Sequence, residues 1–506
     1  MSLPGAWPRR RPLVLLGAVV AAAALLDLSS FHALEHGDSI VPVLVSLQRW
    51  TPFYWDQERF GMLLPLLALP VRDPLGNLLL QRGLLVVAGL GAVVLLARHV
   101  LAGRDWPLAG ALAAGTLLAL APATWLFEFL GDQPYGLGLA LALAGLALAE
   151  GGGVVAPLAG AGQPRRGQRA VRLAGALVLV LLAHWVNAAA GLLLLPLAVA
   201  RAGADLLEGG RLRELRARLG LEAGLLALGL VAGQALIAAY PAMTGKPLRL
   251  EAGTLPPGAW PHAWATLFEN AWRAAAVWGL ILAVAAAAGV LLLLLRPLRG
   301  GLRSALLRAG VLLAAALAYA LFAGSLRWVQ ANAFHWRYLA PSSVLVHLAA
   351  VSLLAEPLAR LPRLARPAAL AALALVPLGA LVAGGPPSLG RVRADLDRVA
   401  GAHTEAILAA RCTAVAGDYW TVWPAVWHVL AVRAERGDPL PVYGISHRSN
   451  PTLPAFLALP AEARRICVPA AERAHAERWF EDYRLGPLDE VGRAGGMRVL
   501  VQREAR

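Results

Sequence analysis

The stretch FHALEHGDSIVPVLVSLQRWTPFYWDQERFGML, from Phe31 to Leu63, follows the first hydrophobic segment and is too polar to continue it. Acids, histidines and arginines are interleaved with aromatic rings, in a connection much longer than is usual between helices. Aromatic rings suit the boundary between lipid and water, but clustered carboxylates and imidazoles there need a separate explanation. Two interpretations are open: a solvated loop with an amphipathic helix on the membrane surface, or the mouth of an active site.

The composition of the whole chain is that of a polytopic membrane protein. Of its 506 residues, 58% are hydrophobic and only 15% are charged, whereas soluble domains carry about 25% charged residues. A net charge of +15 would also suit nucleic-acid binding, but the arginines fall between apolar segments, where they orient a membrane protein. The sequence contains no nucleic-acid-binding motif, so we expect membrane lipids and no nucleic acid among the partners.

Hydropathy predicts about eleven transmembrane helices, each near the twenty residues that a bilayer requires. They lie near residues 13–30, 78–97, 108–130, 136–150, 172–186, 188–203, 219–240, 273–295, 305–325, 341–358 and 368–384. Every second connection is arginine-rich only if 172–203 crosses the membrane twice, so the charge pattern favours two spans there. We interpret the opening segment as a retained span rather than a cleaved signal peptide, because many spans follow it.

The same charge pattern predicts a multi-pass protein of the bacterial inner (cytoplasmic) membrane, with the N-terminus in the cytoplasm. Two domains are expected: a transmembrane domain over 1–384, with a large first external loop at 31–77, and a periplasmic or extracellular α/β domain over 385–506. In the second domain, short apolar segments at 412–417, 440–445, 465–469 and 497–502 alternate with helical patterns. The fold class is thus mainly α and polytopic, with a small C-terminal extracytoplasmic α/β domain.

The two cysteines, Cys412 and Cys467, both lie in this second domain. They are too few for a disulfide scaffold or a thiolate metal site. On the external side of a membrane they can form one disulfide bond, and two buried free thiols are an equally good interpretation.

Three acids in the first external loop are candidate catalytic residues. Asp38, in HGDSI, comes a few residues after the first span, and a carboxylate near apolar walls can serve as a general base. The alternative for Asp38 is a helix N-cap, since an apolar run follows it. Asp56 and Glu58 can line the same cavity or bind a cation, or they can pair with a neighbouring arginine. Trp55 and Arg59, from the same WDQERFG segment, are candidates for substrate binding.

The loop SLRWVQANAFHWRYLAPSS (325–343) is the second informative stretch. Arg327, His335 and Arg337 stand there among aromatic residues, against the expectation that external loops are poor in cations. Arginine binds phosphate through two parallel hydrogen bonds, so this loop suits a lipid-linked phosphate at the membrane boundary. An aromatic belt with arginines against anionic headgroups is the structural alternative. His184, at the break in 172–203, is a weaker substrate-binding candidate.

Several kinds of site are not indicated by the sequence. There is no GxxxxGK[ST] phosphate loop, no GxSxG nucleophile motif, and no HExxH or other compact zinc spacing. We therefore predict no resident metal and no certain cofactor, although the loop acids leave room for a divalent cation.

Four features together resemble an integral-membrane glycosyltransferase of the GT-C superfamily, of the type that uses polyprenyl-phosphate sugars. They are the acid after the first span (HGDSI), the interfacial segment RWTPFYWDQERFG, the late loop RWVQANAFHWRY and the external α/β tail. Many members carry adjacent acids at the first-loop site, whereas Ser39 follows Asp38 here, so a second carboxylate either comes from Asp56 or Glu58 or is absent.

The resemblance implies transfer of a sugar, with inversion, from a lipid-phosphate carrier to a lipid, glycan or protein acceptor on the extracytoplasmic face. Asp38 would then deprotonate the acceptor hydroxyl, and Arg337, helped by Arg327 or His335, would stabilise the departing lipid phosphate. Two alternatives are a transporter or flippase for a lipid or polysaccharide, and a non-catalytic cell-envelope assembly protein.

Overall fold

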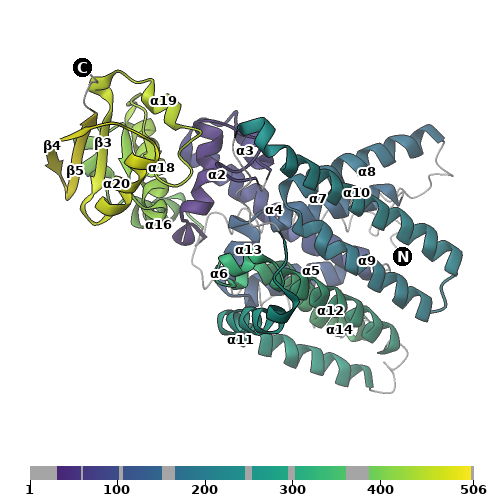
Figure 1. Cartoon of the computed structure of the whole chain (residues 1–506). Coiled ribbons are helices and arrows are strands. Elements are labelled where there is room, and N and C mark those ends of the chain that lie inside the picture. Colours follow the sequence, from purple (N-terminus) through teal and green to yellow (C-terminus); the bar gives the residue numbers. More distant parts are fainter. Residues whose placement is uncertain are drawn as a thin grey trace, which may run out of the picture. The chain divides into compact units, whose positions relative to one another are not determined.

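The computed structural model of the chain describes residues 31–58, 61–101, 106–150, 166–245, 253–294, 302–359 and 387–502. It divides into two compact units (Figure 1). The first, the membrane unit, takes Leu85–Gly385 together with the beginning of the chain; the second, the sheet unit, takes Leu25–Leu84 and Pro386–Arg506. The predicted spans 13–30 and 368–384 lie outside the described residues, as does Arg59.

The membrane unit is a helical bundle. Its main helices are α5 (Trp106–Leu120), α7 (Tyr135–Ala149), α8 (Arg166–Val186), α9 (Ala189–Leu207), α10 (Leu212–Thr244), α11 (Trp260–Leu294), α12 (Leu302–Gly324) and α14 (Ala340–Ala359), and α4 (Pro74–Leu101) runs into it from the sheet unit. Short elements between them are α6 (Ala123–Phe127), the π-helix η2 (Glu128–Asp132), η3 (Pro257–Ala259), α13 (Arg327–Ala331) and η5 (Trp336–Leu339).

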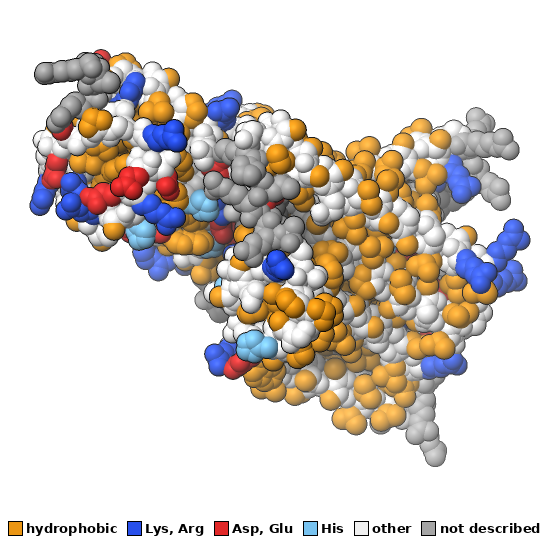
Figure 2. Space-filling view, viewed as in Figure 1, with side chains coloured by type: hydrophobic (Ala, Val, Ile, Leu, Met, Phe, Trp, Pro, Cys, Tyr) orange, Lys and Arg blue, Asp and Glu red, His pale blue; other side chains and the backbone are white. Residues whose placement is uncertain are grey.

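Seven helices among the described residues are long and apolar enough to cross a membrane, and α5 and α7 are shorter apolar helices. The predicted mainly helical, polytopic membrane fold is therefore confirmed. Residues 172–203 form two helices, α8 and α9, which meet at Asn187–Ala188, and each is long enough to cross. Hydrophobic side chains cover the helices of the membrane unit, while basic side chains gather at helix ends (Figure 2).

The sheet unit is built on a five-stranded sheet of order β2-β1-β3-β5-β4. The strands are β1 (Ala414–Ala416), β2 (Tyr443–Ile445), β3 (Arg465–Pro469), β4 (Leu488–Ala494) and β5 (Met497–Gln502). The first three are parallel, and β5 pairs antiparallel with both β3 and β4. The small α/β domain is thus confirmed, and Cys412 and Cys467 are joined in a disulfide with a Cα–Cα distance of 5.8 Å.

Helices connect the strands of this sheet. They are α16 (Leu389–Ala400), α17 (Thr404–Ala409), α18 (Tyr419–Arg436), α19 (Leu453–Leu457) and α20 (Arg473–Asp482), with short turns η6 (Ala461–Ala463) and η7 (Ala470–Glu472). The long stretch after the first span adds η1 (Phe31–Leu34), α2 (Gly37–Leu47) and α3 (Leu63–Ala68) to the same unit.

The apolar face of α2 forms part of the core of the sheet unit. Ile40 and Leu44 are fully buried in one cluster with Trp423 and Trp427 of α18. Burying a large apolar side chain stabilises a fold by about 1.5–3 kcal/mol, which gives this segment a reason to pack on the C-terminal helices. The part of the stretch that forms α2 is therefore a helix of the protein core rather than a solvated loop.

Candidate active site

Asp38 is the second residue of α2, at the end of the helix where backbone N–H groups lack partners. The helix is capped by His36 and Ser39, which satisfy each other's backbone N–H groups in a capping box, so Asp38 is not the N-cap. A negative charge in the first turn is favourable because the helix dipole is positive there. Only 8% of Asp38 is exposed, so its charge needs further compensation.

Tyr419 and Arg448 provide that compensation from the C-terminal part of the sheet unit. The Tyr419 hydroxyl donates to Asp38 Oδ1 at 2.7 Å, and Arg448 Nη1 lies 3.3 Å from the same oxygen. The hydroxyl of Tyr54 donates to the backbone carbonyl of Asp38 at 2.9 Å and lies 3.0 Å from the Tyr419 hydroxyl. A carboxylate, a guanidinium and two phenols therefore meet at one buried point.

The guanidinium of Arg448 is held between two aromatic faces. Its central carbon lies 4.5 Å from the ring centroid of Tyr54 and 4.7 Å from that of Tyr419, within the range of cation–π attraction. Burial opposes the charge of Arg448, but Tyr419, Tyr54 and Asp38 outweigh it and hold the pKa of Arg448 above its ordinary value. Burial likewise raises the pKa of Tyr419 well above its ordinary value, although Arg448 opposes the shift. Tyr419 thus stays a hydrogen-bond donor and Arg448 a cation.

The loop that carries Arg448 is strained and held by hydrogen bonds. Arg448 has a φ of 78°, a left-handed conformation that costs a non-glycine residue about 1–3 kcal/mol. Ser449 Oγ accepts from the backbone of Ser446 at 2.7 Å, and the Tyr483 hydroxyl donates to the Ser446 carbonyl at 2.7 Å. These bonds fix the loop and aim Arg448 at Asp38.

A second buried ion pair fixes the backbone around Asp38. Arg82 donates to both oxygens of Glu35, at 2.6 and 2.8 Å, and to the carbonyl of Ser39 at 2.6 Å. The Ser39 hydroxyl also donates to Glu35 at 2.5 Å. Burial opposes the charge of Glu35, but Arg82 and His32 outweigh it and hold the pKa of Glu35 well below its ordinary value.

The other candidates from the first loop have different places in the sheet unit. Asp56 accepts from the side chain of Asn450 at 2.7 Å and from its backbone at 3.2 Å, so it ties down the loop that carries Arg448. Trp55 is 1% exposed, packs on Trp423 and donates to the carbonyl of Arg49, which is the setting of a core residue. Glu58 is also buried, with 1% exposed.

The late-loop candidates belong to the membrane unit. Arg337 donates to Asn332 at 3.4 Å and lies over the ring of Tyr338, and His335 stacks on Trp336. Arg327 donates to the carbonyl of Thr254 at 3.2 Å, where the two loops form an antiparallel bridge. Arg327, His335 and Arg337 thus lie in one loop of the membrane unit, whereas Asp38 belongs to the sheet unit.

His184 packs between three helices of the membrane unit. It is 4% exposed, and its Nδ1 lies 2.7 Å from the carbonyl of Val180. A Cβ added at Gly229 of α10 would come within 2.7 Å of its Cε1, and one added at Gly191 of α9 would also collide with the ring. His184 is therefore a packed core residue whose ring lies against glycines of α9 and α10.

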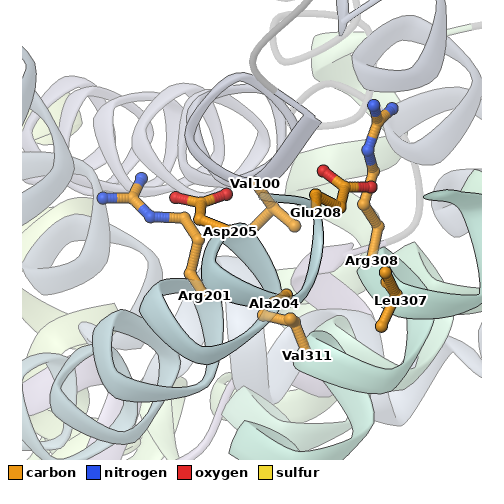
Figure 3. Close-up of a pocket in the computed structure, with 8 residues that line it drawn as sticks. All are labelled: Val100, Arg201, Ala204, Asp205, Glu208, Leu307, Arg308 and Val311. Atoms are coloured by element: carbon orange, nitrogen blue, oxygen red, sulfur yellow. The ribbon is translucent and has the colours of Figure 1, made fainter. Parts of the chain in front are cut away.

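A pocket of different character lies where α4 and α9 end and α12 begins (Figure 3). It is lined by Val100, Arg201, Ala204, Asp205, Glu208, Leu307, Arg308 and Val311. Arg201 is 5% exposed and pairs with Glu222, which Arg218 also contacts at 3.1 Å. No residue that the sequence predicted as catalytic or substrate-binding lines this pocket.

Sequence reasoning missed Tyr419 and Arg448 as partners of Asp38. The position of both residues relative to the strands is a signal that could have predicted them. The two residues follow the parallel strands β1 and β2, which are neighbours in the sheet. The carboxyl ends of parallel strands meet at one edge, which is where α/β proteins usually bind ligands.

Fold and site define a class: a polytopic membrane protein whose C-terminal α/β domain packs on its first long loop around a buried carboxylate. No protein-family model and no curated protein matches the sequence. The chain is similar to the crystal structure of ArnT from Cupriavidus metallidurans in the apo state. The identity is 12% and the TM-score 0.47, over 97% of this chain and 98% of that one.

Proposed function

We propose that the protein is a membrane glycosyltransferase that moves a sugar from a lipid-phosphate carrier to an acceptor on the extracytoplasmic face. The observation that carries the proposal is the buried Asp38 carboxylate, held by Tyr419 and Arg448 at the carboxyl edge of the parallel strands. Arg448 is a buried charge with a strained backbone conformation, and both features lower stability. Such costs are concentrated at functional sites.

In the reaction, Asp38 takes the proton of the acceptor hydroxyl while the hydroxyl oxygen forms a bond to the anomeric carbon. The bond between that carbon and the phosphate oxygen breaks, and the lipid phosphate leaves with the electron pair. Attack from the face opposite the phosphate inverts the anomeric centre. Tyr419 and Arg448 orient the carboxylate, since both contact Oδ1.

The departing phosphate gains negative charge, and Arg337 is the cation that we propose for it, with Arg327 and His335 beside it in the same loop. Arginine suits this role because its planar fork binds phosphate through two hydrogen bonds. A lipid-linked donor also agrees with the missing nucleotide-binding motif, because such a donor presents its phosphate at the membrane. The disulfide between Cys412 and Cys467 supports an extracytoplasmic sheet unit, since disulfides persist in oxidising compartments.

The test is transfer of a radiolabelled sugar from polyprenyl-phosphate sugars to endogenous acceptors, in membranes that contain either the wild type or Asp38→Asn. We expect Asp38→Asn to lower the transfer rate at least about 100-fold, the usual contribution of a general base. Glu405→Gln is the control, because Glu405 is an exposed acid on α17 of the same unit. Assays with Mg²⁺ and with EDTA test whether transfer requires a divalent cation. Full transfer by a folded Asp38→Asn variant would refute the proposed role of Asp38.

A lipid transporter is the second candidate, and the charged pocket of Figure 3 is the observation that favours it. Ionisable groups between membrane helices often mark transport pathways. The pair of Arg201 and Glu222 is largely buried there. A transporter would lose lipid flipping in Arg201→Met proteoliposomes and would show no sugar transfer in the assay above.

A further inference from the structure

Six aromatic rings of the sheet unit form a connected series that we call the aromatic strip. In order they are His36, Trp420, Tyr419, His447, Trp479 and Tyr483. Neighbouring ring centroids are 4.9–6.1 Å apart, and the series combines edge-on and stacked pairs. The rings come from four separate places in the chain, so the strip is a product of tertiary structure.

The strip leads to the candidate base. Tyr419, its third ring, is the residue whose hydroxyl donates to Asp38 at 2.7 Å. His447 is the neighbour of Arg448 in the loop after β2. Trp479 of α20 and Tyr483, directly after that helix, continue the strip. A ligand lying along these rings would therefore have one end close to the carboxylate.

Packing in the core leaves part of the aromatic strip exposed. Tyr419 is buried and Trp479 and Tyr483 pack against the core with one side, but Trp420 is 54% exposed, and His36, His447, Trp479 and Tyr483 are each partly exposed. Exposed tryptophan is disfavoured unless a partner covers it, because its ring is largely apolar. Five partly or largely exposed rings in one connected series are the pattern expected of a binding surface.

The chemistry of the strip suits a carbohydrate. The C–H face of a pyranose ring stacks on an aromatic ring, and its hydroxyls bond to the donors and acceptors at ring edges, here the nitrogens of histidine and tryptophan. Insertion into lipid is a poorer match, because charged side chains flank Trp479 on α20, among them Glu481 and the exposed pair of Arg478 and Asp482. Charged groups are costly to place in the apolar part of a bilayer.

We propose that the aromatic strip binds the acceptor, and that the acceptor is a glycan of several sugar units, whose terminal sugar reaches Asp38. This inference rests on the proposed function, since it names the acceptor class of that same site. Trp420 is then a specificity-determining residue that contacts the sugar nearest the reacting hydroxyl.

The test measures glycan binding separately from transfer. Full-length protein in detergent micelles is titrated with cellohexaose, chitohexaose and mannohexaose, and binding is followed by calorimetry. We expect at least one hexasaccharide to bind, and Trp420→Ala and Trp479→Ala each to weaken it about tenfold, the loss expected for one stacking ring. Leu389→Ala is the matched control, because Leu389 is 53% exposed on α16 of the same unit and belongs to no ring pair.

Three results would overturn the inference: no binding of any hexasaccharide, equal binding by Trp420→Ala, or quenching of Trp420 fluorescence by brominated lipid in nanodiscs. Quenching by brominated lipid would identify the strip as a membrane contact. The difference in fluorescence between the wild type and Trp420→Phe gives the signal of Trp420 alone. Asp38→Asn should retain glycan binding while it loses transfer. Loss of transfer in that variant, with unchanged glycan affinity in Trp420→Ala, would reject the strip and leave the proposed function standing.

Discussion

Glu35 and Arg82 carry opposite charges where water is excluded, and each depends on the other to stay charged. Replacing one partner of such a pair leaves an uncompensated buried charge, which costs about 3–5 kcal/mol. Both side chains also bond to Ser39, the residue after Asp38. The pair therefore fixes the position of the candidate base without touching its carboxylate.

The lowered pKa of Glu35 makes stability depend on pH in a defined direction. In the unfolded chain the group titrates near 4.5, and in the folded protein its pKa is well below that value. Its stabilising effect is thus complete above pH 4.5 and is lost as the pH falls further. We expect Glu35→Gln to lower the melting temperature of the full chain strongly at pH 7, and the difference from wild type to shrink below pH 4.5.

Thermal melts of both proteins in detergent, between pH 7 and pH 3.5, check this expectation. Glu477→Gln serves as the control, because Glu477 is an exposed acid that pairs with Arg473 on the surface. Surface pairs contribute about 0–1 kcal/mol, so this variant should follow the wild type at every pH. A constant difference between wild type and Glu35→Gln across the range would contradict the assigned role.

The position of Asp38 after the first span predicted it as a candidate base, whereas its partners Tyr419 and Arg448 were not predicted. Nothing local to Arg448 distinguishes it from the other arginines of a chain with 46 basic residues. Its strained φ and its place between two tyrosines depend on a loop held by Tyr483 and Asp56, which are distant in sequence. At the scale of single residues, the sequence thus predicted the acid as a candidate, and the structure added the groups that contact it.

Among the elements, α8, α9 and α10 show how small residues allow membrane helices to approach. Gly229 and Gly233 of α10 are spaced as in small-xxx-small packing motifs, and His184 of α8 lies against both. A methyl group at Gly229 has no room, because His184 and Val180 occupy the space. His184, Gly229 and Gly233 therefore pack directly against one another.

We expect Gly229→Ala to destabilise the membrane unit by about 1–3 kcal/mol, the usual cost of overpacking. The double variant Gly229→Ala with His184→Ala should recover part of that loss, because the colliding ring is gone. Melting of the full chain in detergent measures both effects, and Gly224→Ala, where a methyl group meets nothing, is the control. Equal stability of the single and double variants would show that the two residues do not contact each other.

Most elements of the sheet unit followed from sequence periodicity, and β4 is the exception. The pattern LDEVGRA is polar, and most of β4 is exposed because it forms an edge of the sheet with one neighbour. Edge strands carry charges that discourage pairing with other molecules. A search for apolar segments therefore finds the inner strands and passes over this one.

At the scale of the whole molecule, the arginine-rich connections all belong to one end of the membrane helices in the predicted topology. Within the membrane unit, α12 begins at the charged pocket and ends at the loop that carries Arg327 and Arg337. The two ends of this helix should therefore lie on opposite sides of the membrane.

Cysteine labelling in intact cells checks this arrangement. Glu208 lies at the pocket end and Gln330 in the late loop, and both are exposed. A membrane-impermeant maleimide should label Gln330→Cys in intact cells, and Glu208→Cys only after permeabilisation. The two native cysteines form a disulfide, so the wild type should not react with the maleimide and serves as the background control. The opposite pattern would invert the topology and place the late loop in the cytoplasm.

Hydropathy and compactness divide the chain at different places. Hydropathy marks a break near residue 385, and the predicted domains of 1–384 and 385–506 follow that break. The compact units instead group Leu25–Leu84 with the C-terminal residues. The reason is the buried contact of α2 with α18, between segments almost 400 residues apart, which local composition does not record.

The sequence by itself determined that the chain is a helical membrane protein with a small α/β domain. Both conclusions rest on local properties: the length of apolar runs, the placement of arginines and the alternation of short strands with helices. Only the tertiary structure decided which groups surround Asp38, that the cysteines are joined, and that aromatic rings from four segments form one strip. Those features depend on contacts between distant segments, and such contacts are set by packing rather than by any local pattern.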